Sequence, residues 1–223
     1  MITIEQEINQ LKSSVLEMWV IVINQLENAR LALCTNDMDV AAEIHANEKM
    51  IDAFEIKNDG LCETILSTFH PDENITRFVL ASLKINYNLE RVGDYANSIA
   101  NLVRKQETYF DTALLKEVHV AEMFETAHIM NVRAYESYAF NDIARVRNLT
   151  SSDKKINAWK AESLPSLVNF ANTRPADAVQ AFQLFSIIGK LERAGDHLSN
   201  IAEEITFFLD EKIIKHKKIK NNN

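Results

Sequence analysis

The sequence predicts an all-α protein whose six long helices form two tandem, pseudo-symmetric three-helix bundles. The 223 residues include only four Gly and three Pro, so turn signals are few and long helices with short connections are favoured. A six-residue phrase also occurs twice: Leu89–Asp94 reads LERVGD, and Leu191–Asp196 reads LERAGD about half the chain later. A repeat of this period indicates two similar halves. We place them at 1–110 and 111–223.

Each break between the helices carries residues that start or stop a helix. Asn36–Asp37 can cap the second helix, and Pro71 suits the first position of the third. Asp111 precedes the fourth helix, Asn141–Asp142 the fifth, and Pro175 the sixth. The predicted helices cover 4–34, 37–68, 71–106, 112–140, 142–172 and 175–214.

Within these helices, apolar residues recur every three or four positions. The pattern runs from Ile85 to Val103 in the third helix and from Leu184 to Phe208 in the sixth. Such seams are typical of antiparallel bundles, in which three helices close around a shared core. Pro165 should kink or break the fifth helix, because proline cannot donate a backbone hydrogen bond. The two halves are therefore related but not equivalent.

Charge and composition narrow the class of protein. A net charge of −8 argues against a general nucleic-acid binder, which needs a basic surface. Cys34 and Cys62 are not in a CxxC pattern and suit free thiols in a reducing compartment. The first ten residues hold two Glu and no basic residue, unlike a secretory signal. The apolar run 18–23 is far shorter than the ~20 residues that cross a membrane. We expect a cytoplasmic protein without membrane insertion.

The C-terminal tail differs from the rest of the chain in charge. From Lys212 to Asn223 it holds five lysines and ends in three Asn. Lysines suit the end of a helix because they interact favourably with the helix dipole. The tail is therefore either the solvated end of the last helix or a contact with an acidic partner.

The repeated phrase contains two acids four residues apart, which project from one face of a helix. When its leucine and valine lie on the seam, Glu90 and Asp94 fall on the side of the third helix away from the core. The second helix carries its own acidic row, which includes Glu48 and Asp52. Any two helices of a three-helix bundle are neighbours, so the four carboxylates can meet in the groove between the second and third helices.

Converging carboxylates repel one another unless a cation or a proton neutralises them. Glu192 and Asp196 hold the same helix positions in the second copy. Oxygen ligands suit Mg, Ca, Mn and iron, and zinc also accepts carboxylates. An ordinary alternative stays open, since Arg91 and Arg193 can form surface salt bridges with the aspartates three residues later, worth less than about 1 kcal/mol.

Each copy of the phrase also places a glycine inside the helix, at Gly93 and Gly195. A mid-helix glycine costs roughly 1 kcal/mol relative to alanine. Its presence in both copies indicates that another helix approaches closely there. Close packing would also bring the two acidic rows together.

Two copies of a Glu-Arg-x-Gly-Asp phrase, on the third and sixth of six long helices, resemble the PhoU family of phosphate-signalling proteins. The resemblance extends over about residues 5–210 and implies two three-helix bundles with multinuclear iron or zinc clusters at surface acidic motifs. The implied metal ligands are Glu48, Asp52, Glu90 and Asp94 in the first half, and Asp153, Asn157, Glu192 and Asp196 in the second. Because Asn157 replaces a carboxylate and Lys154 and Lys155 lie beside it, we expect stronger metal binding in the first half.

The same resemblance implies a function. PhoU-like proteins are cytoplasmic regulators that link the phosphate ABC transporter, through its ATPase subunit, to a sensor histidine kinase. They restrain phosphate uptake and phosphate-starvation genes when phosphate is plentiful, and they are usually homodimers. The resemblance thus implies a negative regulator of phosphate homeostasis and not an enzyme.

Two other functions stay open at this point. A ferritin-like di-metal oxidase needs two inward-facing Glu-x-x-His pairs, and the chain has one, Glu125 to His128. A metal-free helical adaptor would use its acidic grooves to dock basic partner surfaces. The sequence contains no HExxH, GxSxG or P-loop motif.

Overall fold

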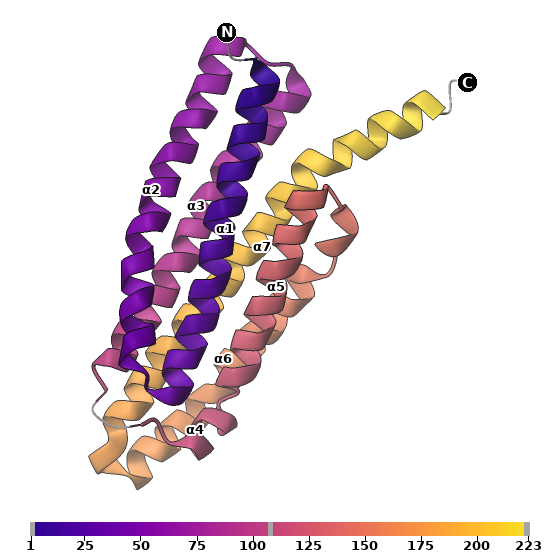
Figure 1. The fold of residues 1–223 in the computed structure, drawn as a ribbon. Helices are drawn as coiled ribbons and strands as arrows, with labels where there is room; N and C mark the ends of the chain where they lie inside the picture. The colour runs from indigo at the N-terminus through magenta and orange to yellow at the C-terminus, as the bar shows by residue number, and fades with distance from the viewer. Residues whose placement is uncertain (1–2, 107–108, 221–223) are drawn as a thin grey trace.

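The computed structural model describes residues 3–106 and 109–220, with side chains up to residue 210. All regular structure in this part of the chain is helical. Helices α1, α2 and α3 pack on one another, as do α5, α6 and α7 (Figure 1). The elements are α1 (Ile4–Thr35), α2 (Met38–Phe69), α3 (Glu73–Arg104), α4 (Thr112–Glu117), α5 (Val120–Phe140), the 3₁₀ helix η1 (Ile143–Arg145), α6 (Leu149–Thr173), the 3₁₀ helix η2 (Pro175–Asp177) and α7 (Ala178–Lys220). The predicted all-α fold of two three-helix bundles is confirmed.

Aspartate side chains cap the starts of α2, α3 and α4. Asp37, Asp72 and Asp111 each accept a hydrogen bond from backbone N–H groups in the first turn of their helix. The caps at Asp37 and Asp111 agree with the predicted starts. Pro71 was expected at the first position of the third helix, but Asp72 caps that helix and Pro71 lies before it.

The second half departs from the predicted boundaries in three places. The helix expected at 175–214 begins as the 3₁₀ helix η2 and continues as α7 from Ala178 to Lys220, and the other two differences are larger. The expected helix 112–140 is divided into α4 and α5, because His119 adopts a left-handed backbone conformation with φ 56°. The expected start at 142 is also wrong. Asp142 caps η1, and α6 begins only at Leu149. Neither of these two larger changes is marked by a Gly or Pro in the sequence.

Pro165 does not interrupt α6, which runs continuously from Leu149 to Thr173. Pro165 lies on the exposed side of the helix, as does Ala161 one turn earlier. The carbonyl of Ala161, which has no N–H partner at Pro165, is therefore on the side of α6 that faces solvent. Leu167 and Phe170 meanwhile bury the opposite side of α6. The predicted break is absent because the buried side of α6, and not the side of Pro165, packs against the rest of the bundle.

Two segments were considered in the sequence for contacts outside the bundle: the apolar run 18–23 with a membrane, and the basic tail with an acidic partner. The run 18–23 lies inside α1, where Met18, Trp19 and Val22 are fully buried. Across the described residues, no helix combines the length and the apolar character that a bilayer crossing requires. The tail from Lys212 to Asn223 lies outside the described side chains.

The two bundles share one hydrophobic core. Helix α3 lies along α7 in the opposite direction (Figure 1), and the Phe78 ring packs edge-on against Phe208 at 5.6 Å between centroids. On the other side, the fully buried Trp19 of α1 donates from Nε1 to Oδ1 of Asn131 on α5, at 2.6 Å. Its ring also contacts Tyr138. The halves are therefore joined by apolar packing and by a buried hydrogen bond.

The motif glycines lie where helices approach closely. A Cβ atom added to Gly93 would lie 2.8 Å from Cδ1 of Ile51, and one added to Gly195 would lie 3.1 Å from Cδ1 of Ile156. Gly60 and Gly189, outside the motifs, have nothing within 4 Å. The close packing expected at the motif glycines is confirmed.

This contrast yields a test. Gly93→Leu should lower the free energy of unfolding by about 2 kcal/mol, because it overpacks the α2–α3 contact. Gly60→Ala should raise it by about 1 kcal/mol, because alanine is the better helix former and open space surrounds the site. Urea denaturation followed by circular dichroism measures both. Equal stability of the Gly93→Leu variant and the unmodified protein would contradict the close approach.

Candidate functional site

The two copies of the motif lie side by side where α3 crosses α7. Nδ1 of His197 is 2.8 Å from Oδ1 of Asn88, and Nζ of Lys84 is 2.9 Å from a carboxylate oxygen of Glu204. As residue numbers rise along α3, those of their partners fall along α7, so the copies run antiparallel. Tyr95, which follows the first motif, packs on His197, which follows the second, at 5.7 Å between ring centroids. The pseudo-twofold axis therefore passes between the two motifs.

Glu90 is buried, which corrects the prediction that it faces away from the core. It is 6% exposed, as is Asn97, two turns further along the same side of α3. Asp94 is half-buried. The neighbours of Glu90 on the same side of α3 contact α2: Asn86 donates to Asp59, and Ile51 packs on Gly93. Glu90 is therefore enclosed between α3 and α2 of the first bundle.

Burial sets the electrostatics of Glu90. Its pKa is raised to about 7, first because burial penalises the carboxylate and then because Asp94 and Glu55 repel it. Arg91 opposes this shift. The Arg91 guanidinium pairs with Glu90 and, at 3.0 Å, with Asp94. At neutral pH the site therefore holds a carboxyl that exchanges a proton, beside an arginine that balances part of the negative charge.

Helix α2 contributes Glu55 to this group, a residue the predicted ligand set omitted. Burial raises the pKa of Glu55, with further repulsion from Asp59, Asp52 and Asp94 and an opposing attraction from Arg91. Of the predicted α2 ligands, Asp52 thus belongs to the same charged group, while Glu48 pairs with His45 at 3.3 Å. Glu55 lies in the same acidic row, three residues after Asp52, and that spacing was the available signal.

In the second half, all four predicted residues interact. Burial raises the pKa of Asp153, and Asp196 and Glu192 repel it. Nδ2 of Asn157 donates to Asp153 at 3.3 Å. Oδ1 of Asp153 and Oδ1 of Asn157 are both buried without a hydrogen-bond partner. Nζ of Lys160 lies 2.9 Å from Oε2 of Glu192 and neutralises it.

One position distinguishes the two halves electrostatically. Ile51 and Ile156 contact the motif glycines in equivalent ways, and four residues after them stand Glu55 and Lys160. At this position the first half therefore has a carboxylate, Glu55, where the second half has a cation, Lys160. This difference points in the same direction as the expectation from Asn157, Lys154 and Lys155 that the first half binds metal more strongly, which stays a prediction.

The carboxyls of these groups can take up a proton, and their oxygen atoms are of the type that hard cations prefer. No three or more His, Cys, Asp or Glu among the described side chains come together in an arrangement that could hold a metal ion. Arg91 and Lys160 pair with the carboxylates that a metal would use. The metal sites inferred from the sequence stay a prediction.

The Glu125–His128 pair does not have the geometry of a ferritin-like site. Glu125 is exposed on α5, whereas such a site requires a carboxylate that points into the bundle. His128 is half-buried and, after the larger effect of Arg30, helps to lower the pKa of Glu27 on α1. The structure therefore offers no support for a di-metal oxidase at this pair.

Known proteins resemble the chain along nearly its whole length. The family model described as the PhoU domain matches residues 15–103 and 120–205. The chain is 26% identical over 206 residues to the phosphate-specific transport system accessory protein PhoU homolog of Deinococcus radiodurans, covering 92% of this chain and 96% of that one. It is 27% identical over 190 residues to the homolog of the same name from Borreliella burgdorferi, covering 83% and 85%. The crystal structure of PhoU from Pseudomonas aeruginosa shares the fold with a TM-score of 0.85 at 24% identity, covering 94% of this chain and 100% of that chain. The chain belongs to the PhoU family.

Proposed function

We propose that this chain is a cytoplasmic accessory protein of phosphate transport that acts as a regulator and not as an enzyme. The observation that supports the proposal is the match of the PhoU domain model to both halves. Relatives that align with most of the chain are named phosphate-specific transport system accessory proteins. The chemistry of the motifs agrees with this role, because their carboxylates suit the binding of a cation or a proton.

The regulation would be negative and would work through protein contacts. When phosphate is plentiful, the protein would bind the ATPase subunit of a phosphate ABC transporter and a sensor histidine kinase, and so restrain uptake and starvation genes. The shared core of the two bundles suits an adaptor, since it holds a partner on one half at a fixed position relative to the other. Exposed apolar side chains on α6 and α7, including Val168 and Phe182, offer surface for a homodimer or a complex.

Removing the protein from its host tests this function. Deletion should raise phosphate uptake in phosphate-rich medium, and expression of the chain in trans should restore the low rate. A pull-down with the transporter's ATPase subunit measures the partner contact directly. Unchanged uptake after deletion would count against the regulatory role.

We also propose that the acidic sites bind a multinuclear iron or zinc cluster. The ligands would be Glu48, Asp52, Glu90 and Asp94 in the first half and Asp153, Asn157, Glu192 and Asp196 in the second. Their oxygen atoms suit both metals, and the unpartnered Oδ1 atoms of Asp153 and Asn157 are free to accept a cation. When bound, the metal would neutralise the carboxylates that now repel one another. Arg91 and Lys160 would have to release their carboxylates first.

Competition between Lys160 and a metal gives a sharp prediction. Lys160→Met should increase the affinity of the second-half site for Zn²⁺ by about tenfold, because it removes a positive charge 2.9 Å from Glu192. The exposed Lys116→Met on α4 is the control and should leave the affinity unchanged. Isothermal titration calorimetry with Zn²⁺ measures both variants.

Metal analysis of protein purified without chelator separates this proposal from the metal-free adaptor. Glu90→Ala combined with Asp94→Ala should lower the iron or zinc content. If the unmodified protein retains neither metal and the double variant is indistinguishable from it, the cluster is ruled out. The adaptor would then be the better description.

A further inference from the structure

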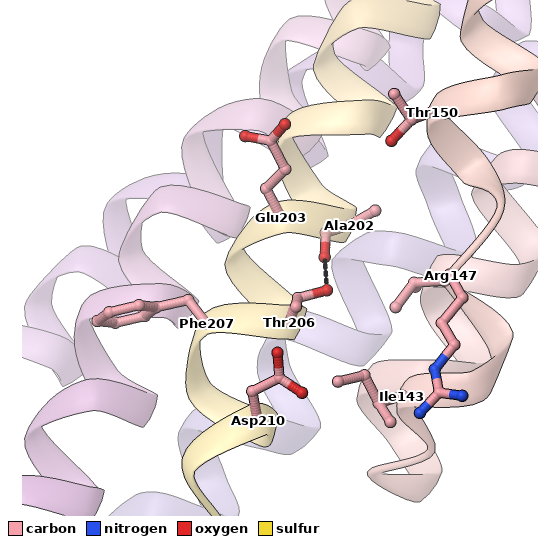
Figure 2. A pocket seen from close by; sticks show the side chains of 9 residues that line it. Ile143, Arg147, Thr150, Ala202, Glu203, Thr206, Phe207 and Asp210 are labelled. Carbon is pink, nitrogen blue, oxygen red and sulfur yellow. Dashed lines mark hydrogen bonds between the residues drawn. The ribbon is translucent and has the colours of Figure 1, made fainter.

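The outer side of α7 carries a cleft that neither acidic site uses. It lies between α7 and the segment formed by η1 and the start of α6, and its volume is about 420 Å³ (Figure 2). Buried apolar side chains form its floor: Ile143 and Val146 from one side, and Ala202 from α7. The Phe207 ring points away from the cleft (Figure 2), and Arg77 and Lys84 of α3 lie over it. The cleft can therefore receive one large apolar side chain from outside.

Charged side chains flank this apolar floor. Glu203 and Asp210 of α7 line the cleft and are exposed, and the described side chains give neither an ion pair. They are seven residues apart, so they lie on one face of α7 about 10 Å from each other along the axis. Asp196, seven residues before Glu203, is also exposed and extends the row. Arg147 lines the opposite side of the cleft (Figure 2).

We propose that this cleft is the docking groove for a basic, amphipathic helix presented by a partner protein. A leucine or phenylalanine of that helix would enter the floor at Val146 and Ala202. Lysines or arginines seven residues apart would pair with Glu203 and Asp210. An acidic residue on the opposite edge of the helix would meet Arg147, which fixes the direction in which the helix lies. This is the recognition of a helix by a groove.

Charge and spacing select this occupant over others. The acids repeat every two helical turns, which matches cations seven residues apart on one face of a partner helix. The chain has a net charge of −8, so the surface of a second copy would on balance repel the acidic row. The motif carboxylate Asp196 adjoins the row but does not line the cleft, and the proposal does not depend on metal binding.

Fluorescence anisotropy with designed peptides tests the groove on the full chain. The probe is a labelled 21-residue helical peptide with leucines on one stripe and lysines at three positions seven apart. A second peptide carries glutamates at those positions, and a third has the lysines distributed around the helix. The lysine-row peptide should bind, and the other two should bind at least tenfold more weakly.

Variants of the chain locate the binding. Glu203→Gln combined with Asp210→Asn should weaken binding of the lysine-row peptide about tenfold and flatten its salt dependence, because two ion pairs are lost. Thr150→Trp, at the exposed rim of the cleft, should also weaken it by blocking the floor. The matched control, Glu162→Gln combined with Asp177→Asn, removes two exposed acids elsewhere and should change nothing. Circular dichroism confirms that each variant is folded.

Three results would overturn the proposal. In the first, the Glu203 and Asp210 variant binds the peptide as tightly as the unmodified chain. In the second, the matched control weakens binding equally, so that the attraction is non-specific. In the third, the peptide does not bind, but light scattering shows a dimer that the groove variant disrupts; the occupant is then a second copy.

Discussion

Trp19→Ala should lower the free energy of unfolding by about 3–5 kcal/mol, the range for removal of a large buried aromatic side chain. Trp19 is fully buried and packs between Tyr135 and Tyr138 of α5. Its Nε1 also donates to Asn131, so the variant leaves a buried amide oxygen unpaired. Because these contacts join α1 to the second bundle, both halves should lose stability together. Guanidinium denaturation followed by circular dichroism measures the effect.

The chain's second tryptophan supplies the control for this variant. Trp159 is half-buried and stacks on His119 at 6.1 Å between ring centroids. Trp159→Phe should cost less than about 1.5 kcal/mol, since an aromatic ring is retained at a partly exposed position. The variant also leaves Trp19 as the sole tryptophan, whose fluorescence then reports on the junction. If Trp19→Ala lowers the free energy of unfolding no more than Trp159→Phe does, Trp19 does not join the two bundles through a buried contact.

Glu90→Gln should stabilise the metal-free protein at pH 8 by about 2 kcal/mol and leave it nearly unchanged at pH 5. The pKa of Glu90 is about 7 in the folded protein, above its ordinary value of 4.5. Between these pH values the folded state keeps a proton that the unfolded state releases, so stability falls as pH rises towards 7. Above pH 7 the full penalty of a buried carboxylate remains. Glutamine does not ionise and avoids that penalty.

Thermal and urea denaturation at both pH values, in the presence of EDTA, measure the difference. The control is Glu162→Gln on the exposed side of α6, which should change the free energy of unfolding by less than about 0.5 kcal/mol at either pH. Glu90→Gln that destabilises the protein at pH 8 would mean that the ion pair with Arg91 outweighs the burial of Glu90. A stabilised variant that also loses metal would indicate that Glu90 is kept for binding at the expense of stability.

The helices and the duplication could be predicted because they depend on local patterns. Apolar residues at steps of three and four mark the seams of α3 and α7, and aspartates mark the starts of α2 and α4. The break at His119 and the late start of α6 at Leu149 could not be predicted. No Gly or Pro marks them, and the left-handed residue His119 stacks on Trp159 of α6, a contact between residues distant in the chain.

Some features of the candidate site could likewise be predicted from the sequence, and others could not. The motif pair, its glycines and the asymmetry caused by Asn157 follow from the sequence, because each is a matter of residue type and spacing. The burial of Glu90 does not, since a helical pattern indicates a groove between the second and third helices but not how closely α2 and α3 approach in it. Glu55 and Lys160 likewise gained their importance from contacts between helices distant in the chain.

By itself, the sequence determined that this protein is all-helical, that its two halves are duplicates, and that its third and last long helices carry paired acids. Only the tertiary structure decided which of those acids are buried, which cations neutralise them, and that a separate acidic cleft lies open on α7. The physical reason is that helix formation and periodicity depend on neighbours within a few residues. The pKa of a carboxyl depends on every charge and apolar atom within several ångströms, whatever its place in the chain.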